Sequence, residues 1–235
     1  AYDISAVAAA MDQKILQLEH VSSNLANAAT PGFKSKHLYL LNVLEEESKA
    51  GETTALLTNI ILDFAQGIAQ KTDNPLDLTI QGDGFFVIQT PNGQAYTRKG
   101  DFTINSKSQM VTQAGDAVLG EGGTLALENG KIHIIEDGSI LVDGNQIGKL
   151  KIVDFTNRQA LRSTGNGLYY DDGEAGIKPV NKPHISTNSI ELSNVNVITE
   201  MADMINIHRT FETYQKIIQQ LAEQDKLATN RIGRV

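Results

Sequence analysis

The chain has 235 residues, of which 40% are apolar and 20% charged, so it can bury a sizeable core and wholesale disorder is disfavoured. Its formal net charge of −8 argues against nucleic acid as the main partner, because phosphate binding requires a basic surface. The lack of cysteine excludes disulfides, thiol catalysis and cysteine-ligated metals.

The first predicted element is a helix over about residues 3–28. Its apolar side chains recur every three or four positions, which predicts a narrow, coiled-coil-like stripe on one face. The stripe consists of Ile4, Ala8, Met11, Ile15, Leu18, Val21 and Leu25. We expect Thr30-Pro31-Gly32 to end the helix, because proline disfavours helical geometry in the residue before it and glycine can adopt a positive φ.

Residues 34–74 are predicted to form an extended connector with some strand character. Two short apolar runs, 38–41 and 60–64, flank an acidic patch at Glu45-Glu46-Glu47. We expect a mobile portion at about residues 45–54.

From residue 75 the pattern changes to short strands separated by glycine-containing turns. Residues 76–80 alternate with period two, and Asn92-Gly93 is the strongest hairpin signal in the chain. Strands are predicted at 76–80, 85–89, 95–98, 102–104, 110–112, 117–119, 124–127, 131–135, 139–142 and 148–155. This spacing is typical of an all-β sandwich or barrel-like unit. Residues 156–190 are expected to be rich in loops.

A second long helix is predicted from about Val197 to Asn230. Its stripe consists of Met201, Met204, Ile207, Phe211, Tyr214, Ile218 and Leu221. Asn196 is suited to be the N-cap, and Glu200 in the first turn suits the helix dipole. The sequence thus predicts an α+β fold, with two terminal helices around a central all-β domain.

A search for catalytic or ligand-binding patterns yields no catalytic, cofactor-binding or metal-binding residue. The histidines do not form a zinc pattern, and Gly82-Asp83-Gly84 fails the phosphate-loop spacing because position 87 is valine. Paired acids such as Asp171-Asp172 lie beside glycines and are interpreted as solvated turns. We therefore expect no enzyme activity, no cofactor and no small-molecule substrate. We also expect no membrane insertion, since no segment reaches the roughly 20 apolar residues that span a bilayer.

The two helical stripes remain as the main functional feature. Each helix could pack on its own β domain, or the helices could pair with each other and with neighbouring copies. The narrow, heptad-like stripes favour pairing. A helix of 25 to 30 residues also spans roughly 40 Å, which is long for a domain of about 110 residues.

Four stretches, in order along nearly the whole chain, closely resemble the flagellar rod and hook family of bacteria. They are Ser23-Asn24-Leu25-Ala26-Asn27-Ala28-Ala29-Thr30-Pro31-Gly32-Phe33-Lys34, Asp77-Leu78-Thr79-Ile80-Gln81-Gly82-Asp83-Gly84-Phe85-Phe86, Tyr96-Thr97-Arg98-Lys99-Gly100-Asp101-Phe102 and Ser193-Asn194-Val195-Asn196-Val197. The stretch 115–127 and the compact length resemble a proximal rod member, with a distal rod member as the alternative.

The resemblance implies a subunit of the flagellar basal-body rod, the tubular drive shaft that transmits motor torque to hook and filament. Residues 1–33 and 193–235 would form an inner coiled-coil domain, 34–74 a connector and 75–192 an outer β-rich domain. The implied partners are copies of itself and other rod proteins. The implied location is the periplasm-spanning rod, reached through type III export as an unfolded chain. That route agrees with the start of the chain, which does not look like a cleavable signal.

The residues expected at the subunit interface come from both stripes and from the first motif. In that motif, asparagine side chains can bond backbone groups near the helix end, and an aromatic side chain can anchor the following turn. An ordinary helix stop with one core aromatic is the simpler alternative. The expected interface residues are Met11, Ile15, Leu18, Asn24, Leu25, Asn27, Phe33, Met201, Met204, Ile207, Phe211, Tyr214, Ile218 and Leu221.

Two functions of other classes stay open on the sequence. The first is a β-rich binding module with the helices as an oligomerisation stalk. The second is an enzyme such as a glycoside hydrolase, which would need two facing carboxylates in a cleft.

Overall fold

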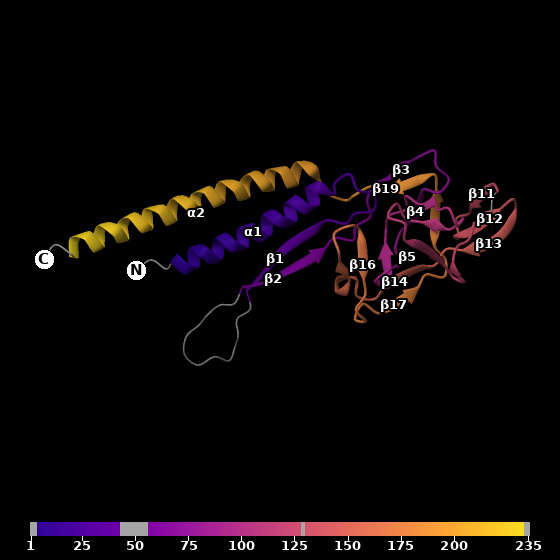
Figure 1. Cartoon of the computed structure of the whole chain (residues 1–235), viewed down its shortest axis with the longest axis horizontal. Coiled ribbons are helices and arrows are strands. Elements are labelled where there is room, and N and C mark those ends of the chain that lie inside the picture. The colour runs from indigo at the N-terminus through magenta and orange to yellow at the C-terminus, as the bar shows by residue number, and fades with distance from the viewer. Residues whose placement is uncertain (1–3, 43–55, 128–129, 233–235) are drawn as a thin grey trace. The chain divides into compact units, whose positions relative to one another are not determined.

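A computed structural model describes residues 4–42, 56–127 and 130–232. The fold is α+β, with helix α1 (Ile4–Ala26) before a β-rich region and helix α2 (Val197–Ile232) after it (Figure 1). The chain divides into two compact units. A helical unit takes residues 1–26, 36–60 and 196–235, and a β unit takes residues 27–35 and 61–195. The two helices lie within about two residues of their predicted bounds.

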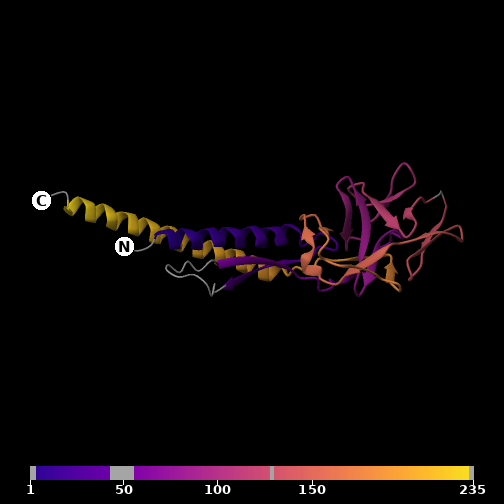
Figure 2. The same ribbon diagram turned by 90° about the horizontal axis from the view of Figure 1, so that it is seen from below.

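In the helical unit, α1 and α2 lie side by side and run antiparallel (Figures 1 and 2). The predicted connector contains two strands, β1 (Lys36–Asn42) and β2 (Leu56–Leu62), which pair with each other, and β1 contacts α1. The predicted mobile portion at 45–54 lies outside the described residues. Over the described residues, neither α1 nor α2 combines the length and apolar character that a membrane span needs.

The predicted start and stop signals of the helices are confirmed. The Asn196 side-chain oxygen accepts hydrogen bonds from the N–H groups of Ile198 at 3.1 Å and Thr199 at 3.3 Å, which is N-cap geometry. At the end of α1, the Thr30 N–H donates to the Asn27 carbonyl at 3.0 Å, and Gly32 adopts φ +64°. A Cβ on Gly32 would lie 2.4 Å from the carbonyl carbon of Arg98, so this turn both requires a left-handed residue and excludes a side chain.

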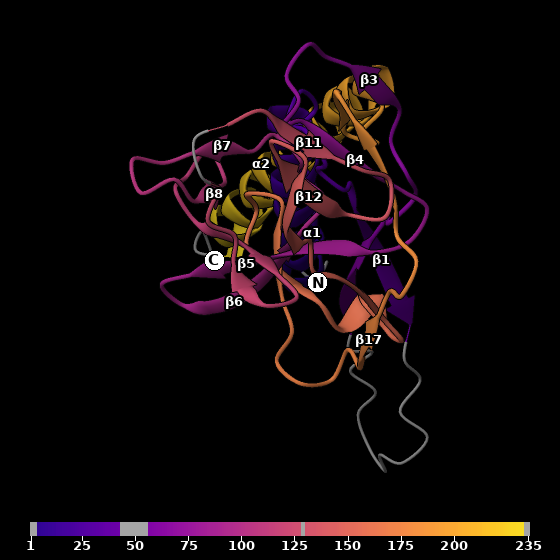
Figure 3. The same ribbon diagram turned by 90° about the vertical axis from the view of Figure 1, so that its right-hand side faces the viewer.

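Among the described residues, the largest sheet of the β unit has ten strands. Its main path runs β15-β16-β6-β5-β9-β8-β7, with β10 beside β9, β14 beside β5 and β17 beside β14. The predicted hairpin is confirmed, because β5 pairs antiparallel with β6 and places Thr90 opposite Gly93 (Figure 3). The strands are β5 (Phe85–Thr90), β6 (Gly93–Thr97), β7 (Thr103–Ile104), β8 (Met110–Val111), β9 (Ala117–Gly120), β10 (Gly123–Thr124), β14 (Ile152–Phe155), β15 (Arg162–Ser163), β16 (Leu168–Tyr170) and β17 (Ile177–Pro179).

Over the residues that the structure describes, three smaller sheets complete the β unit. In the first, β12 lies between β11 and β13; in the other two, β18 pairs with β4 and β19 pairs with β3. These strands are β3 (Ala69–Lys71), β4 (Leu78–Gln81), β11 (Ile132–Ile134), β12 (Ser139–Val142), β13 (Asn145–Lys149), β18 (His184–Thr187) and β19 (Ser189–Glu191). The β18–β4 and β19–β3 pairs each join a strand from the C-terminal part of the β region to a strand from its N-terminal part.

One strand prediction is wrong in detail, and the region predicted to be rich in loops also contains short strands. The single strand predicted over 148–155 is two strands, β13 and β14, which belong to different sheets and are separated by the buried Leu150. The loop-rich region 156–190 contains a 3-10 turn at Arg158–Ala160 and the strands from β15 to the start of β19. Strands of two to four residues are too short for alternation to be visible in the sequence.

The core of the β unit consists of two apolar clusters on the strands. One includes Phe86 and Phe102, whose rings meet edge to face at 5.0 Å between centroids. The other includes Tyr96 and Phe155, with centroids 4.8 Å apart. Edge-to-face pairs of this kind add to the stabilisation from burial alone.

Candidate functional site

The predicted stripes lie only partly in the seam between α1 and α2. Ile207 is buried, whereas Ile15 is 42% exposed and Met201 51% exposed. The half-buried stripe residues are Met11, Leu18, Val21, Leu25, Met204, Phe211, Tyr214, Ile218 and Leu221. The helix pair therefore buries part of the apolar surface that the sequence predicted for an interface and leaves another part exposed.

Asn24 ties three elements of the helical unit together. Its buried side-chain amide donates to the Lys36 carbonyl at 2.9 Å and to the Glu200 carboxylate at 2.9 Å, and its oxygen accepts from the Lys36 N–H at 2.9 Å. The side chain thus pairs with the start of β1 as a neighbouring strand would, while it holds the first turn of α2. Glu200, for which the sequence predicted only a dipole effect, is 7% exposed and serves this contact.

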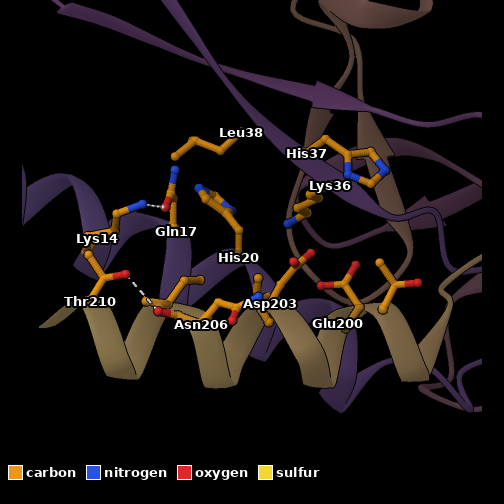
Figure 4. A pocket seen from close by; sticks show the side chains of 13 residues that line it. Lys14, Gln17, His20, Lys36, His37, Leu38, Glu200, Asp203, Asn206 and Thr210 are labelled. Carbon is orange, nitrogen blue, oxygen red and sulfur yellow. Dashed lines mark hydrogen bonds between the residues drawn. The ribbon is translucent and has the colours of Figure 1, made fainter. Parts of the chain in front are cut away.

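A cavity of about 440 Å³ lies in the helical unit between α1, β1 and α2 (Figure 4). Lys14, His20 and Lys36 line it on one side and Glu200 and Asp203 on the other. Burial lowers the pKa of His20 and of Lys36, and the Lys36 charge lowers the pKa of His20 further. The cavity is thus lined by charged side chains of both signs. Among the residues that the structure describes, no group of side chains is arranged to ligate a metal ion.

The segment after α1 is anchored in the β unit by buried charges. Phe33 is 1% exposed, and the next residue, Lys34, donates to Glu191 at 2.5 Å and to the Ala65 carbonyl at 2.6 Å. The side chains of Lys34 and Glu191 are both 0% exposed. Asn27 lies half-buried at the start of this segment, where its side-chain oxygen accepts from the Thr30 hydroxyl at 3.2 Å.

Glu191 is the centre of this buried cluster. Besides Lys34, it accepts from the Gly67 N–H at 3.0 Å and from the Arg98 guanidinium at 3.4 Å. Arg98 also donates to the Gly82 carbonyl at 2.7 Å and lies over the Phe85 ring, 5.3 Å from its centroid. Burial lowers the pKa of both Lys34 and Arg98, while the Glu191 charge raises each of them. The carboxylate is therefore needed to hold two cations inside the β unit.

Asn194 connects the same two segments through the backbone. Its side chain accepts from the Ser35 N–H and donates to the Asp63 carbonyl, each at 2.8 Å, and its own N–H donates to the Phe33 carbonyl at 3.4 Å. The segments that follow α1 and precede α2 are thereby fixed against each other inside the β unit.

The sequence did not assign roles to Lys34, Arg98, Glu191 or Asn194. Three of them lie within the quoted motifs, and Glu191 precedes the last motif by two residues. The sequence signal that could have pointed to Lys34 and Arg98 is their charge, because each lies in a motif that is otherwise apolar or turn-forming. Its partner could not be identified, because Lys34 and Glu191 are 157 positions apart.

Because of Tyr169, the β unit should lose stability at alkaline pH. Burial raises the pKa of its phenol well above the ordinary value of 10.0, so the neutral form is favoured in the folded state. This contribution is complete below pH 10.0 and is lost as pH rises above it. We expect unfolding in urea to show a loss of up to about 1.4 kcal/mol per pH unit above that value, and Tyr169→Phe to flatten the slope.

Tyr170→Phe is the matched control for this test, because Tyr170 is the next residue and only half-buried. Its slope should stay close to that of the wild type. An unchanged slope in Tyr169→Phe would contradict the assignment.

Comparisons with known proteins show similarity to proteins of the bacterial flagellum. The family described as "Flagellar hook protein FlgE/F/G D1 domain" matches residues 79–145, and "Flagellar basal body rod FlgEFG protein C-terminal" matches residues 186–231. The flagellar basal-body rod protein FlgF of Caulobacter vibrioides is 32% identical to this chain, with 93% of each chain covered. FlgF of Escherichia coli is 34% identical, with 89% of each covered. The flagellar basal-body rod protein FlgG of Buchnera aphidicola is 30% identical over 88% of this chain and 91% of the relative.

Proposed function

The chain belongs to the flagellar basal-body rod proteins, so it is a structural subunit of the rod in the bacterial flagellum, and we propose that it assembles through its paired terminal helices. In this proposal, α1 and α2 form a coiled-coil-like inner domain whose exposed apolar side chains contact neighbouring subunits. Many copies and other rod proteins would then stack into a tubular wall. The likeness to FlgF supports placing the chain with the proximal rod members, and the distal members, FlgG, are the alternative.

The observation that carries this proposal is the incomplete burial of the helical stripes. A stripe that served only to close the helical unit would be covered by it, yet Ile15 and Met201 remain exposed. Exposed apolar side chains on a protein surface mark contacts with a partner when they gather along one element. The β-rich binding module with a helical stalk is not favoured, since the relatives are rod proteins.

We further propose a division into an inner helical domain, a connector and an outer β-rich domain, predicted from the sequence at residues 1–33 with 193–235, at 34–74 and at 75–192. The compact units move these bounds, because residues 27–33, 61–74 and 193–195 belong to the β unit. Subunits of a tube need one part that stacks along the axis and another that covers it. The subunit would be a structural component without enzyme activity, exported through the flagellar apparatus. Its torque-transmitting role would follow from tight stacking of the inner domains.

Replacing Ile207 with aspartate tests the role of the helix pair. Ile207 is 8% exposed on α2 and lines the cavity beside Glu200 and Asp203, so aspartate would replace a buried apolar side chain by a third carboxylate there. We expect the helical unit to lose about 3–4 kcal/mol of stability. Far-UV circular dichroism should report lost helix, and the variant should be missing from purified basal bodies. Gln220→Asp adds the same charge at an exposed position of α2 and should leave both unchanged. Normal incorporation of Ile207→Asp would refute the proposal.

A further inference from the structure

Helix α2 carries an apolar face that points away from its contact with α1. Ile198, Met201 and Ile205 are 81%, 51% and 58% exposed. Their spacing of three and four residues places them on one side of the helix, and the buried Ile207 lies about half a turn away. Two exposed cations, Arg209 and Lys216, continue the same side toward the C-terminal end. These five residues are called the basic face below.

Helix α1 carries an exposed face of opposite charge. Asp12, Ile15 and Glu19 are exposed with the same spacing of three and four residues, so they also share one side of their helix. These three residues are called the acidic face. The exposed residues that flank it, Ala8 and Ser22, are small, and small side chains let another helix approach closely.

The two faces match in charge and in spacing. Asp12 and Glu19 are seven residues apart, as are Arg209 and Lys216, and seven helical residues correspond to about 10 Å along an axis. The exposed Glu212 lies between the two cations, so the charged part of the basic face keeps one net positive charge. When Asp12 and Glu19 lie opposite Arg209 and Lys216, Ile15 lies opposite the stem of Glu212. The apolar part of the basic face, Ile198, Met201 and Ile205, then extends along α1 past the small Ala8 or Ser22, where the two helices can approach closely.

We propose that the acidic face of α1 in one copy binds the basic face of α2 in a second copy of this chain. The inference rests on the proposed function and specifies which surfaces meet. Because the two faces are different, the contact is head-to-tail and each copy keeps one face free for the next. Contacts of this kind continue into helical assemblies unless the rotation closes a ring.

Charge reversal tests the pairing on the purified full-length chain. The first variant, Asp12→Lys with Glu19→Lys, turns the acidic face basic. The second, Arg209→Glu with Lys216→Glu, turns the basic face acidic. Sedimentation velocity over a concentration series at low salt should show open-ended association of the wild type. Each variant alone should need at least about tenfold higher concentration to associate, because like charges then meet.

An equimolar mixture of the two variants distinguishes this pairing from other contacts. In the mixture, the reversed α1 face of the first variant can bind the reversed α2 face of the second variant. The unchanged α1 face of the second variant can bind the unchanged α2 face of the first. The two variants should therefore co-assemble in alternation. A matched control for the first variant, Glu121→Lys with Glu174→Lys, makes the same change of charge at exposed sites of the β unit and should associate like the wild type. Added salt should weaken association of the wild type and of the mixture alike.

Three results would overturn the inference. They are a wild-type chain that stays monomeric throughout, reversal variants that associate normally, or a mixture that stays apart. Incorporation of the wild-type chain into purified basal bodies is measured separately, because it tests the proposed function and not the pairing of the faces. A chain that enters the rod while its reversals have no effect would refute the pairing of the faces and leave the proposed function intact.

Discussion

Replacing Glu191 with alanine is expected to lower the free energy of unfolding of the β unit by about 3–5 kcal/mol. The carboxylate contacts Lys34 and Arg98 inside the unit, and both its own side chain and that of Lys34 are 0% exposed. Its removal would leave two buried cations without their counter-charge and the Gly67 N–H without its acceptor. Urea unfolding followed by tyrosine fluorescence measures the change, since the chain has tyrosine and lacks tryptophan.

Two further variants sharpen the interpretation. Glu191→Gln keeps an acceptor for Gly67 but loses the charge, so its effect should be smaller than that of alanine. Glu174→Ala removes an exposed carboxylate and should change the stability by less than about 0.5 kcal/mol. A loss below about 1 kcal/mol in Glu191→Ala would show that the cations find other partners or water, contrary to the role assigned to the cluster.

Two N-terminal deletions are expected to separate assembly from folding. Deletion of residues 1–26 removes α1 and keeps the segment 27–35, which belongs to the β unit. This variant should lose assembly, because the seam of α2 is uncovered and the acidic face is gone, while the β unit unfolds at the same urea concentration as in the wild type. Deletion of residues 1–35 also removes Phe33 and Lys34, and should cost the β unit at least about 4 kcal/mol.

The comparison between the deletions is the decisive measurement, because each serves as the control for the other. Equal stability of the two would contradict the anchoring of the β unit by its N-terminal segment. Recovery of the shorter deletion, 1–26, in purified basal bodies would contradict assembly through the helix pair.

The sequence predicts the long elements of this fold well. Each helix has a stripe of seven apolar residues, so the signal accumulates over many turns and the bounds of α1 and α2 follow closely. The strand β12 coincides with its predicted range, 139–142, and the Asn92-Gly93 hairpin follows from local turn chemistry. The pairings of β18 with β4 and of β19 with β3 could not be predicted, because the register between distant short strands depends on tertiary packing.

In the candidate site, too, the sequence predicts what a side chain can do but not which distant residues surround it. The Asn24 side chain does bond backbone, but the backbone is that of Lys36 at the start of β1 and not that of the end of α1. The exposure of Ile15 and Met201 could not be predicted, since periodicity assigns a side chain to a face and does not say what covers that face. The membership of the stripe residues in a subunit interface stays a prediction.

The contacts that complete the two units join residues at opposite ends of the chain. Asn24 and Glu200 are 176 positions apart, and Lys34 and Glu191 are 157 positions apart. Closing such long loops has a high entropic cost, so both units should fold late and slowly compared with proteins held by local contacts. A polypeptide whose synthesis stopped before Glu191 would lack one partner of each contact. Such fragments would also lack α2 and its basic face, so only full-length chains could both complete the two units and continue the assembly.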